Sequence, residues 1–110
     1  MLTFASLLIA SQAASPATPV GRDWITCSFR QIQRLYEDQA TAESVTDSAL
    51  LLCERQYQTY WAAMHRQYIT RAVADPIQST NLYMTKRKAE LRADLLATVL
   101  DMRAVMRGKP

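Results

Sequence analysis

The chain has 110 residues and a mass of 12.5 kDa, which limits it to a single domain. Its 49% hydrophobic and 21% charged residues are typical of a folded protein and exclude a disordered one. Two glycines, one histidine and two cysteines exclude a glycine-rich nucleotide loop, a histidine-rich metal site and a four-cysteine zinc site.

The net charge of +3 is unevenly distributed. The segment from Gln56 to Pro110 carries nine basic and four acidic residues, whereas the 21 residues at the start carry no charged side chain. This excess favours an acidic partner or an anionic surface, although a solvated helix face explains it as well.

The first predicted element is an export signal rather than part of the fold. Residues 2–10 (LTFASLLIA) form a short apolar run, and small residues follow at the positions that a signal peptidase reads. The run is too short for a permanent membrane-spanning helix, which takes about 20 apolar residues. We expect a signal peptide over residues 1–13, cleaved after Ala13, a flexible leader over 14–22, and a mature protein in the periplasm or secreted.

No lysine or arginine precedes the apolar run, which is unusual for a signal peptide. Either the true start lies upstream of Met1, or the amino group of Met1 supplies the positive charge alone. An unprocessed cytosolic N-terminus and an uncleaved anchor remain as alternatives to export.

A first helix is predicted from Asp23 to Ala40, where the chain has no glycine or proline and apolar residues recur at helical spacing. The apolar residues form two stripes on different faces, so the helix needs a partner on each. Docking on a later helix or formation of a homodimer would cover the second face. The two stripes are Ile25, Phe29, Ile32 and Tyr36, and Trp24, Cys27, Ser28, Gln31 and Leu35.

Residues 41–44 interrupt this pattern, and Ser44 followed by Asp47 resembles a capping box. A second helix is predicted from about Val45 to Val73, a stretch without glycine or proline. No alternation typical of a β-strand occurs there or elsewhere over a useful length.

A third helix follows the Asp75-Pro76 pair, which is typical of a helix start. A competing cap would move this start to near Thr80. The helix extends to about Arg107, and residues 108–110 form a tail because they contain a glycine and a proline.

We therefore predict an all-α domain over residues 23–107, with three helices in up-down-up order. The second and third helices, each about 45 Å long, pack antiparallel, and the shorter first helix lies alongside. Cys27 and Cys53 are nearly equidistant from the turn at 41–44, which places them at the same height. In an oxidising compartment this predicts a disulfide between the first two helices; in the cytosol the pair would be two buried thiols.

No group of residues in the sequence is typical of a catalytic site. His65 has no carboxylate at neighbouring helical positions, so we interpret it as a rim side chain. Glu90 and Asp94 lie beside Lys86 and Arg87, and surface ion pairing explains them better than a pair of glycosidase carboxylates. We expect a protein that is not an enzyme and that uses no cofactor and no metal.

Three groups of residues are candidates for binding. Aromatic side chains on the second helix form either a partner or ligand surface or part of the core. A short basic run on the third helix is a candidate contact with anionic lipid or polymer, and it is too short for a typical nucleic-acid arm. Four methionines are candidate copper(I) ligands or core residues. The groups are Tyr57, Tyr60, Trp61 and Tyr68; Lys86, Arg87 and Lys88; and Met64, Met84, Met102 and Met106.

Four segments that cover about a third of the chain carry a resemblance to known proteins: residues 2–13, 24–27, 45–53 and 95–101. With them the chain resembles small exported proteins of unknown function from Gram-negative bacteria. The resemblance implies export and the cysteine pair, and it implies no activity.

Binding to another component of the cell envelope, either a protein or an anionic surface, is the function that we expect from the sequence. A carrier of a small ligand or of copper, using the aromatic and methionine residues, is the alternative. An enzyme of unknown type is a third and weaker hypothesis.

Overall fold

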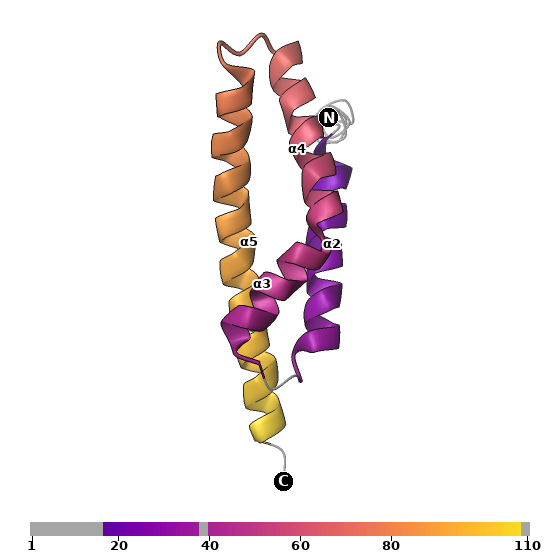
Figure 1. Ribbon diagram of the computed structural model, residues 1–110, viewed down its shortest axis with the longest axis vertical. Coiled ribbons are helices and arrows are strands. Elements are labelled where there is room, and N and C mark those ends of the chain that lie inside the picture. Colours follow the sequence, from indigo (N-terminus) through magenta and orange to yellow (C-terminus); the bar gives the residue numbers. More distant parts are fainter. Residues whose placement is uncertain (1–16, 38–39, 109–110) are drawn as a thin grey trace, which may run out of the picture.

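Helices account for all the regular structure in the computed structural model, which describes residues 17–37 and 40–108 (Figure 1). The longest helix, α5, runs along one side of an elongated bundle, and α3 and α4 follow each other along it. The remaining helix, α2, packs against both α3 and α4. In chain order the helices are α2 (Ala17–Leu35), α3 (Ala42–Leu52), α4 (Glu54–Thr70) and α5 (Pro76–Arg107).

The predicted all-α class is confirmed, but the arrangement of three helices is wrong, because the predicted second helix is divided into α3 and α4. The chain leaves helical geometry at Cys53 (φ −104°, ψ 21°). The amide of Cys53 donates instead to the carbonyl oxygen of Leu50 at 3.2 Å, three residues back. The break allows α3 to cross α5 obliquely while α4 runs beside it (Figure 1).

The first two described helices begin at residues that the sequence pattern did not indicate. The helix α2 begins at Ala17, inside the segment 14–22 that was expected to be a leader, and Pro19 lies in its first turn, where proline is tolerated. The helix α3 is capped by Thr41, whose Oγ1 accepts a hydrogen bond from the amide of Ser44 at 3.1 Å. The expected cleavage site after Ala13 lies outside the described residues.

The start of α5 agrees with the first of the two predicted positions. Asp75 caps the helix, and its Oδ1 accepts a hydrogen bond from the amide of Gln78 at 3.1 Å. The alternative start near Thr80 is therefore wrong, and the predicted end at Arg107 is confirmed. None of the helices in the described ranges has the combination of length and hydropathy that crossing a membrane requires.

The buried face of α2 combines residues of both predicted stripes, Trp24 and Ser28 from the second and Ile32 from the first. Trp24, Ser28 and Ile32 are almost inaccessible to solvent, whereas Ile25 and Phe29 are only partly buried. The hydroxyl of Ser28 donates to the carbonyl oxygen of Trp24 at 2.9 Å, which satisfies this polar group inside the core. The helices α3, α4 and α5 all contact α2 and together bury one face of it.

Gly21 on α2 lies close to the ring of Tyr60 on α4. A Cβ atom added there would lie 3.0–3.3 Å from three ring atoms of Tyr60. That ring cannot easily move, because it packs on Trp24 and its hydroxyl is 2.8 Å from the hydroxyl of Tyr83. The absence of a side chain at Gly21 therefore sets the separation of the two helices.

Replacement of Gly21 by valine is expected to lower the free energy of unfolding by about 1–3 kcal/mol, because the added side chain separates α2 from α4. Urea denaturation measures the change. The matched control is Gly108→Val, where an added Cβ makes only ordinary contacts of 3.5–3.6 Å and the change should stay within about 0.5 kcal/mol. Equal losses in the two variants would show that the contact with Tyr60 is not tight.

Two arginines attach α5 to the other helices. Arg92 donates from Nε to Oδ1 of Asp47 on α3 at 2.8 Å, and its charge holds the pKa of that carboxyl below the usual range. Arg103 donates from Nε at 2.8 Å to the carbonyl oxygen of Tyr36, just after the end of α2. A positive charge at the C-terminal end of a helix is favourable, so the charge of Arg103 stabilises the end of α2. Together, the contacts of Arg92 and Arg103 fix the position of α5 along its axis relative to α3 and α2.

Candidate functional site

The predicted disulfide is confirmed and lies at the break between α3 and α4. Cys27 on α2 and Cys53 are joined, with their Cα atoms 6.0 Å apart. Cys53 is fully buried, whereas Cys27 is partly exposed. No free cysteine remains among the described residues, so the bond ties the middle of α2 to the point where the chain changes direction.

Two of the four predicted aromatic residues belong to the core. The rings of Tyr57 and Tyr60 pack against Trp24, with centroids 5.2 and 5.9 Å from it. Tyr60 is only 5% exposed. These two tyrosines therefore hold α4 against α2, with Tyr60 inside the core and Tyr57 partly buried against it.

The other two predicted aromatic residues lie nearer the end of the bundle where α4 meets α5. Trp61 donates from Nε1 to Oδ1 of Asn81 on α5 at 2.8 Å, and its ring stacks on His65 with the centroids 5.0 Å apart. Tyr68, one turn beyond His65, is partly buried against the core. His65 thus lies at the rim of the bundle, partly exposed and stacked on the indole of Trp61.

A pair of phenols joins α4 to α5 inside the bundle. The hydroxyls of Tyr60 and Tyr83 are 2.8 Å apart, and their rings meet edge to face. Burial, together with this hydrogen bond, raises the pKa of Tyr83 to about 12 from the ordinary value of 10.0.

The stability of the protein is expected to fall as the pH rises from about 10 to about 12. The folded chain holds the proton of Tyr83 more tightly than the unfolded chain, whose phenol ionises near the ordinary pKa of 10.0. The contribution of this proton is therefore complete below pH 10 and is lost as the pH approaches the folded pKa. Urea midpoints measured across this range should fall less for Tyr83→Phe than for the wild type, and parallel curves would contradict the assignment.

The predicted basic run does not form one patch, because its three members point to different surroundings. Lys86 is exposed on the outer side of α5. Nη1 of Arg87 lies 3.7 Å from Oε1 of Glu90, and Nζ of Lys88 lies 4.9 Å from the centre of the Tyr57 ring. Only Lys86 remains available as part of a basic surface.

The four candidate copper ligands are not brought together. Met64 and Met84 are buried in the core, whereas Met106 is exposed near the end of α5. At 1.5 Å per residue, Met84 and Met106 are about 33 Å apart along that helix. Within the part of the chain that the structure describes, no three His, Cys, Asp or Glu side chains form a group that could hold a metal ion.

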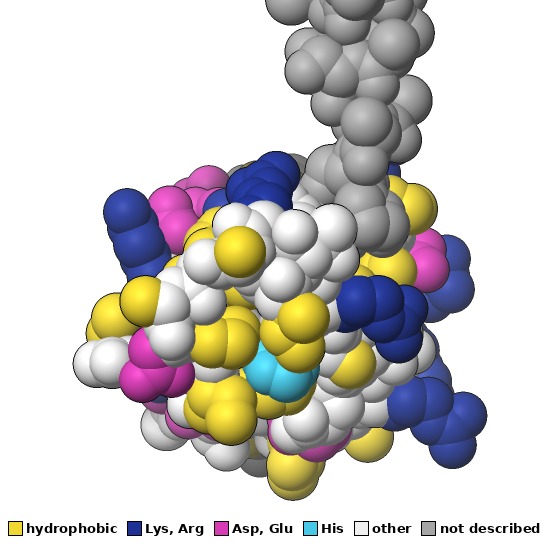
Figure 2. Space-filling model, turned by 90° about the horizontal axis from the view of Figure 1, so that it is seen from above, with side chains coloured by type: hydrophobic (Ala, Val, Ile, Leu, Met, Phe, Trp, Pro, Cys, Tyr) yellow, Lys and Arg dark blue, Asp and Glu magenta, His cyan; other side chains and the backbone are white. Residues whose placement is uncertain are grey.

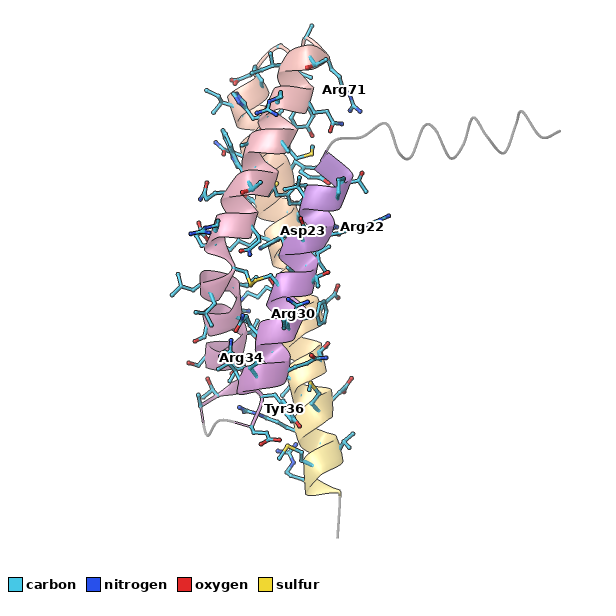
Figure 3. The ribbon with its side chains drawn as sticks, turned by 90° about the vertical axis from the view of Figure 1, so that its right-hand side faces the viewer. Arg22, Asp23, Arg30, Arg34, Tyr36 and Arg71 are labelled. Carbon is cyan, nitrogen blue, oxygen red and sulfur yellow. A yellow bond between two sulfur atoms is a disulfide. The ribbon has the colours of Figure 1, made fainter. Side chains whose placement is uncertain are left out.

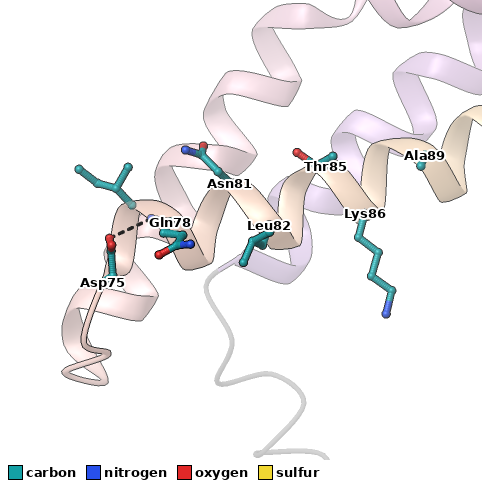
Figure 4. A pocket seen from close by; sticks show the side chains of 8 residues that line it. Asp75, Gln78, Asn81, Leu82, Thr85, Lys86 and Ala89 are labelled. Atoms are coloured by element: carbon teal, nitrogen blue, oxygen red, sulfur yellow. Dashed lines mark hydrogen bonds between the residues drawn. The ribbon is translucent and has the colours of Figure 1, made fainter.

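A shallow apolar groove runs along the first half of α5 (Figure 4). Its volume is about 660 Å³, and among the described residues its lining belongs to α5 and the cap of α5, so none of the other described helices closes it. A groove with a single wall suits a macromolecular surface better than a small molecule, whose sites bury most of the ligand. The lining residues are Asp75, Ile77, Gln78, Asn81, Leu82, Thr85, Lys86 and Ala89.

The groove begins at an end of the molecule that is unusually apolar for a surface, here called the α4–α5 end. It consists of the last turns of α4, the connection 71–75 and the first turns of α5. Ile69, Ile77 and Leu82 are 54%, 57% and 66% exposed there. Seen from this end, the one histidine is surrounded by hydrophobic side chains, with basic side chains farther out (Figure 2).

The sequence pattern did not identify this end, because the helical stripes predict only which residues face a partner helix. One signal was present: Ile69 and Ile77 flank the Asp75-Pro76 break at positions that the core stripes do not require. Residues beyond the last inter-helix contact have no neighbour to cover them, so apolar side chains there are left exposed.

A different surface, on α2, is polar and basic. Arg22, Arg30 and Arg34 are exposed along one side of this helix (Figure 3). Beside the disulfide, Arg30 lines a polar hollow of about 450 Å³, in which Oε1 of Gln56 is buried without a hydrogen-bond partner. No exposed large hydrophobic side chain among the described residues belongs to α2.

Comparison with known proteins gives no assignment. The chain matches no protein-family model, no curated protein and no solved structure. The resemblance to exported bacterial proteins therefore stays a prediction, and a function has to be inferred from the geometry of the surfaces described above.

Proposed function

We propose that this is a non-enzymatic protein of the cell envelope that binds another envelope component through the α4–α5 end. The observation that carries the proposal is the exposure of Ile69, Ile77 and Leu82, three large apolar side chains at one end of a small bundle. Apolar groups gathered in this way on a folded domain mark an interaction surface. The adjoining groove on α5 extends the same surface.

The proposed location rests on two further observations. A disulfide between Cys27 and Cys53 persists in an oxidising compartment and is rare in the cytosol. The apolar run at residues 2–10 is of the kind that directs export. The carrier hypothesis is less well supported, because Met84 and Met106 lie far apart on α5 and the described lining of the groove comes from one helix.

Site-specific photocrosslinking tests the binding surface. A photoreactive amino acid in place of Leu82, in cells that export the protein, should give an adduct that is lost when Ile77→Asp is added. The matched control is the same amino acid in place of Ala97, which is exposed on the same helix but away from this end. The absence of an adduct from Leu82, or an equal adduct from Ala97, would contradict the proposal.

The mass of the exported product tests the compartment. We expect a chain that begins at Ala14 and gains the mass of two hydrogen atoms on reduction. A full-length chain recovered inside the cell, with Cys27 and Cys53 both open to alkylation, would contradict the proposed location.

A further inference from the structure

Positive charge is concentrated around the α4–α5 end. Between residues 66 and 86 the sequence has three basic residues and a single acidic residue, Asp75. The carboxylate of Asp75 is engaged as the cap of α5 through the amide of Gln78. Arg66, Arg71 and Lys86 are exposed within this region, and Figure 3 shows Arg71 at the top of the bundle.

The apolar side chains at this end lie within a narrow layer. Ile69 is in the last turn of α4 and Ile77 is in the first turn of α5, on the two sides of the connection 71–75. Leu82 follows five residues later, which is about 7.5 Å farther along the helix axis. A layer of this thickness matches the roughly 5–10 Å to which interfacial helices bury their apolar groups in a bilayer.

An apolar tip within a basic surrounding is typical of a segment that inserts shallowly into an anionic membrane. Trp61, which is partly exposed beside His65, adds an amphipathic ring of the kind that favours the interface. The core of a protein–protein interface is instead depleted in charge and in lysine. We propose that the α4–α5 end docks on a bilayer that contains anionic phospholipid; this inference rests on the proposed function and names its partner.

Two other surfaces of the described chain each have only one of the two features. The arginines on α2 are basic, but α2 exposes no large hydrophobic side chain. Leu51 and Leu52 are 73% and 60% exposed, but residues 42–54 include three acidic residues and no basic one. An anionic surface would attract the first surface without insertion and repel the second.

Sedimentation with lipid vesicles tests the docking with the full, disulfide-bonded protein. It should bind vesicles of phosphatidylglycerol and phosphatidylethanolamine, with an affinity at least about tenfold higher than for phosphatidylcholine vesicles, and binding should weaken as salt is added. Trp61 emission should shift to the blue on binding, and Trp61→Phe should abolish the shift because the other tryptophan, Trp24, is 1% exposed. Equal binding to both kinds of vesicle, or to neither, would overturn the proposal.

Two multiple variants locate the contact. Replacing Arg66, Arg71 and Lys86 by glutamine should lower the partition onto anionic vesicles about a hundredfold. The control removes the same amount of charge from α2 with Arg22→Gln, Arg30→Gln and Arg34→Gln. This control should lower the partition onto anionic vesicles roughly threefold or less. An equal loss in the control would place the contact on α2 and overturn the proposal.

The apolar contribution has its own pair of variants. Ile69→Gln with Ile77→Gln should lower the partition about tenfold, because these side chains then no longer favour insertion. The control, Leu51→Gln with Leu52→Gln, removes two equally exposed apolar side chains elsewhere and should leave the partition unchanged. All these positions are exposed, and thermal unfolding of each variant verifies that it folds.

The outcomes separate this inference from the proposed function. If Leu82 photocrosslinks to an envelope protein and vesicles do not bind, the membrane partner is wrong and the proposed function stands. If Leu82 gives no adduct in cells and vesicles do not bind, both are wrong. A lipid adduct from Leu82 together with binding to anionic vesicles supports both.

Discussion

Replacing Cys27 and Cys53 together by alanine is expected to lower the free energy of unfolding by about 3.5 kcal/mol. The bond closes a loop with a sequence separation of 26 residues, and its removal returns conformational freedom to the unfolded chain. In a domain of this size the loss corresponds to a decrease of roughly 15–25 °C in the unfolding midpoint. Thermal and urea unfolding, followed by circular dichroism, measure both quantities.

Reduction of the wild-type protein provides the matched control. Because the bond contributes mainly through the unfolded chain, the reduced wild type should unfold near the midpoint of the double variant. A midpoint that reductant leaves unchanged, in a sample whose mass shows complete reduction, would mean that the bundle does not depend on this bond.

Trp24→Ala should lower the free energy of unfolding by about 3–5 kcal/mol, the range for loss of a large buried aromatic side chain. Trp24 is 1% exposed and makes aromatic contacts with both Tyr57 and Tyr60. Its removal leaves a cavity between α2 and α4, beside the Tyr60 ring that also packs against Gly21. Urea denaturation should show a lower midpoint with little change in slope.

Trp61→Ala is the control for this prediction, because Trp61 is the second tryptophan of the chain and is not fully buried. Its hydrogen bond to Asn81 is exposed, so the decrease in the free energy of unfolding should stay below about 1 kcal/mol. Similar losses in the two variants would place the core elsewhere than between α2 and α4.

The parts of the fold that the sequence predicts are those decided by local chemistry. Asp75 and Pro76 specify the start of α5 because an aspartate cap and a proline in the first turn act within a few residues. The disulfide follows from simple symmetry, since Cys27 and Cys53 are equidistant from a turn. The cap needs no contact between helices, whereas the disulfide also requires that the two helices pack side by side.

The parts that were missed are decided by contacts between distant residues. The break at Cys53 contains no glycine or proline that would indicate it in the sequence. It separates α4 from α3, and the ion pair of Asp47 and Arg92 attaches α3 to α5. The sequence did not predict the early start of α2, because Gly21 is a poor helix former. In the structure, the lack of a side chain at Gly21 permits close packing against Tyr60.

The candidate site was predicted only in fragments. Trp61 and Lys86 were identified by type, but their neighbours in sequence, Tyr60 and Arg87, face the interior of the bundle. Whether an apolar residue such as Ile77 is exposed depends on where the last inter-helix contact falls. A periodic pattern along one helix contains no information about that point.

The position of the sulfur bridge divides the chain into regions that would respond differently to proteolysis. A protease cut anywhere between residues 28 and 52 leaves both fragments covalently joined through Cys27 and Cys53, so the molecule remains one piece until a reductant is present. A cut in the connection 71–75 has no such bridge across it, and α5 would be retained only by noncovalent packing. The exposed apolar end is therefore also where a single nick could detach a whole helix from the rest of the molecule.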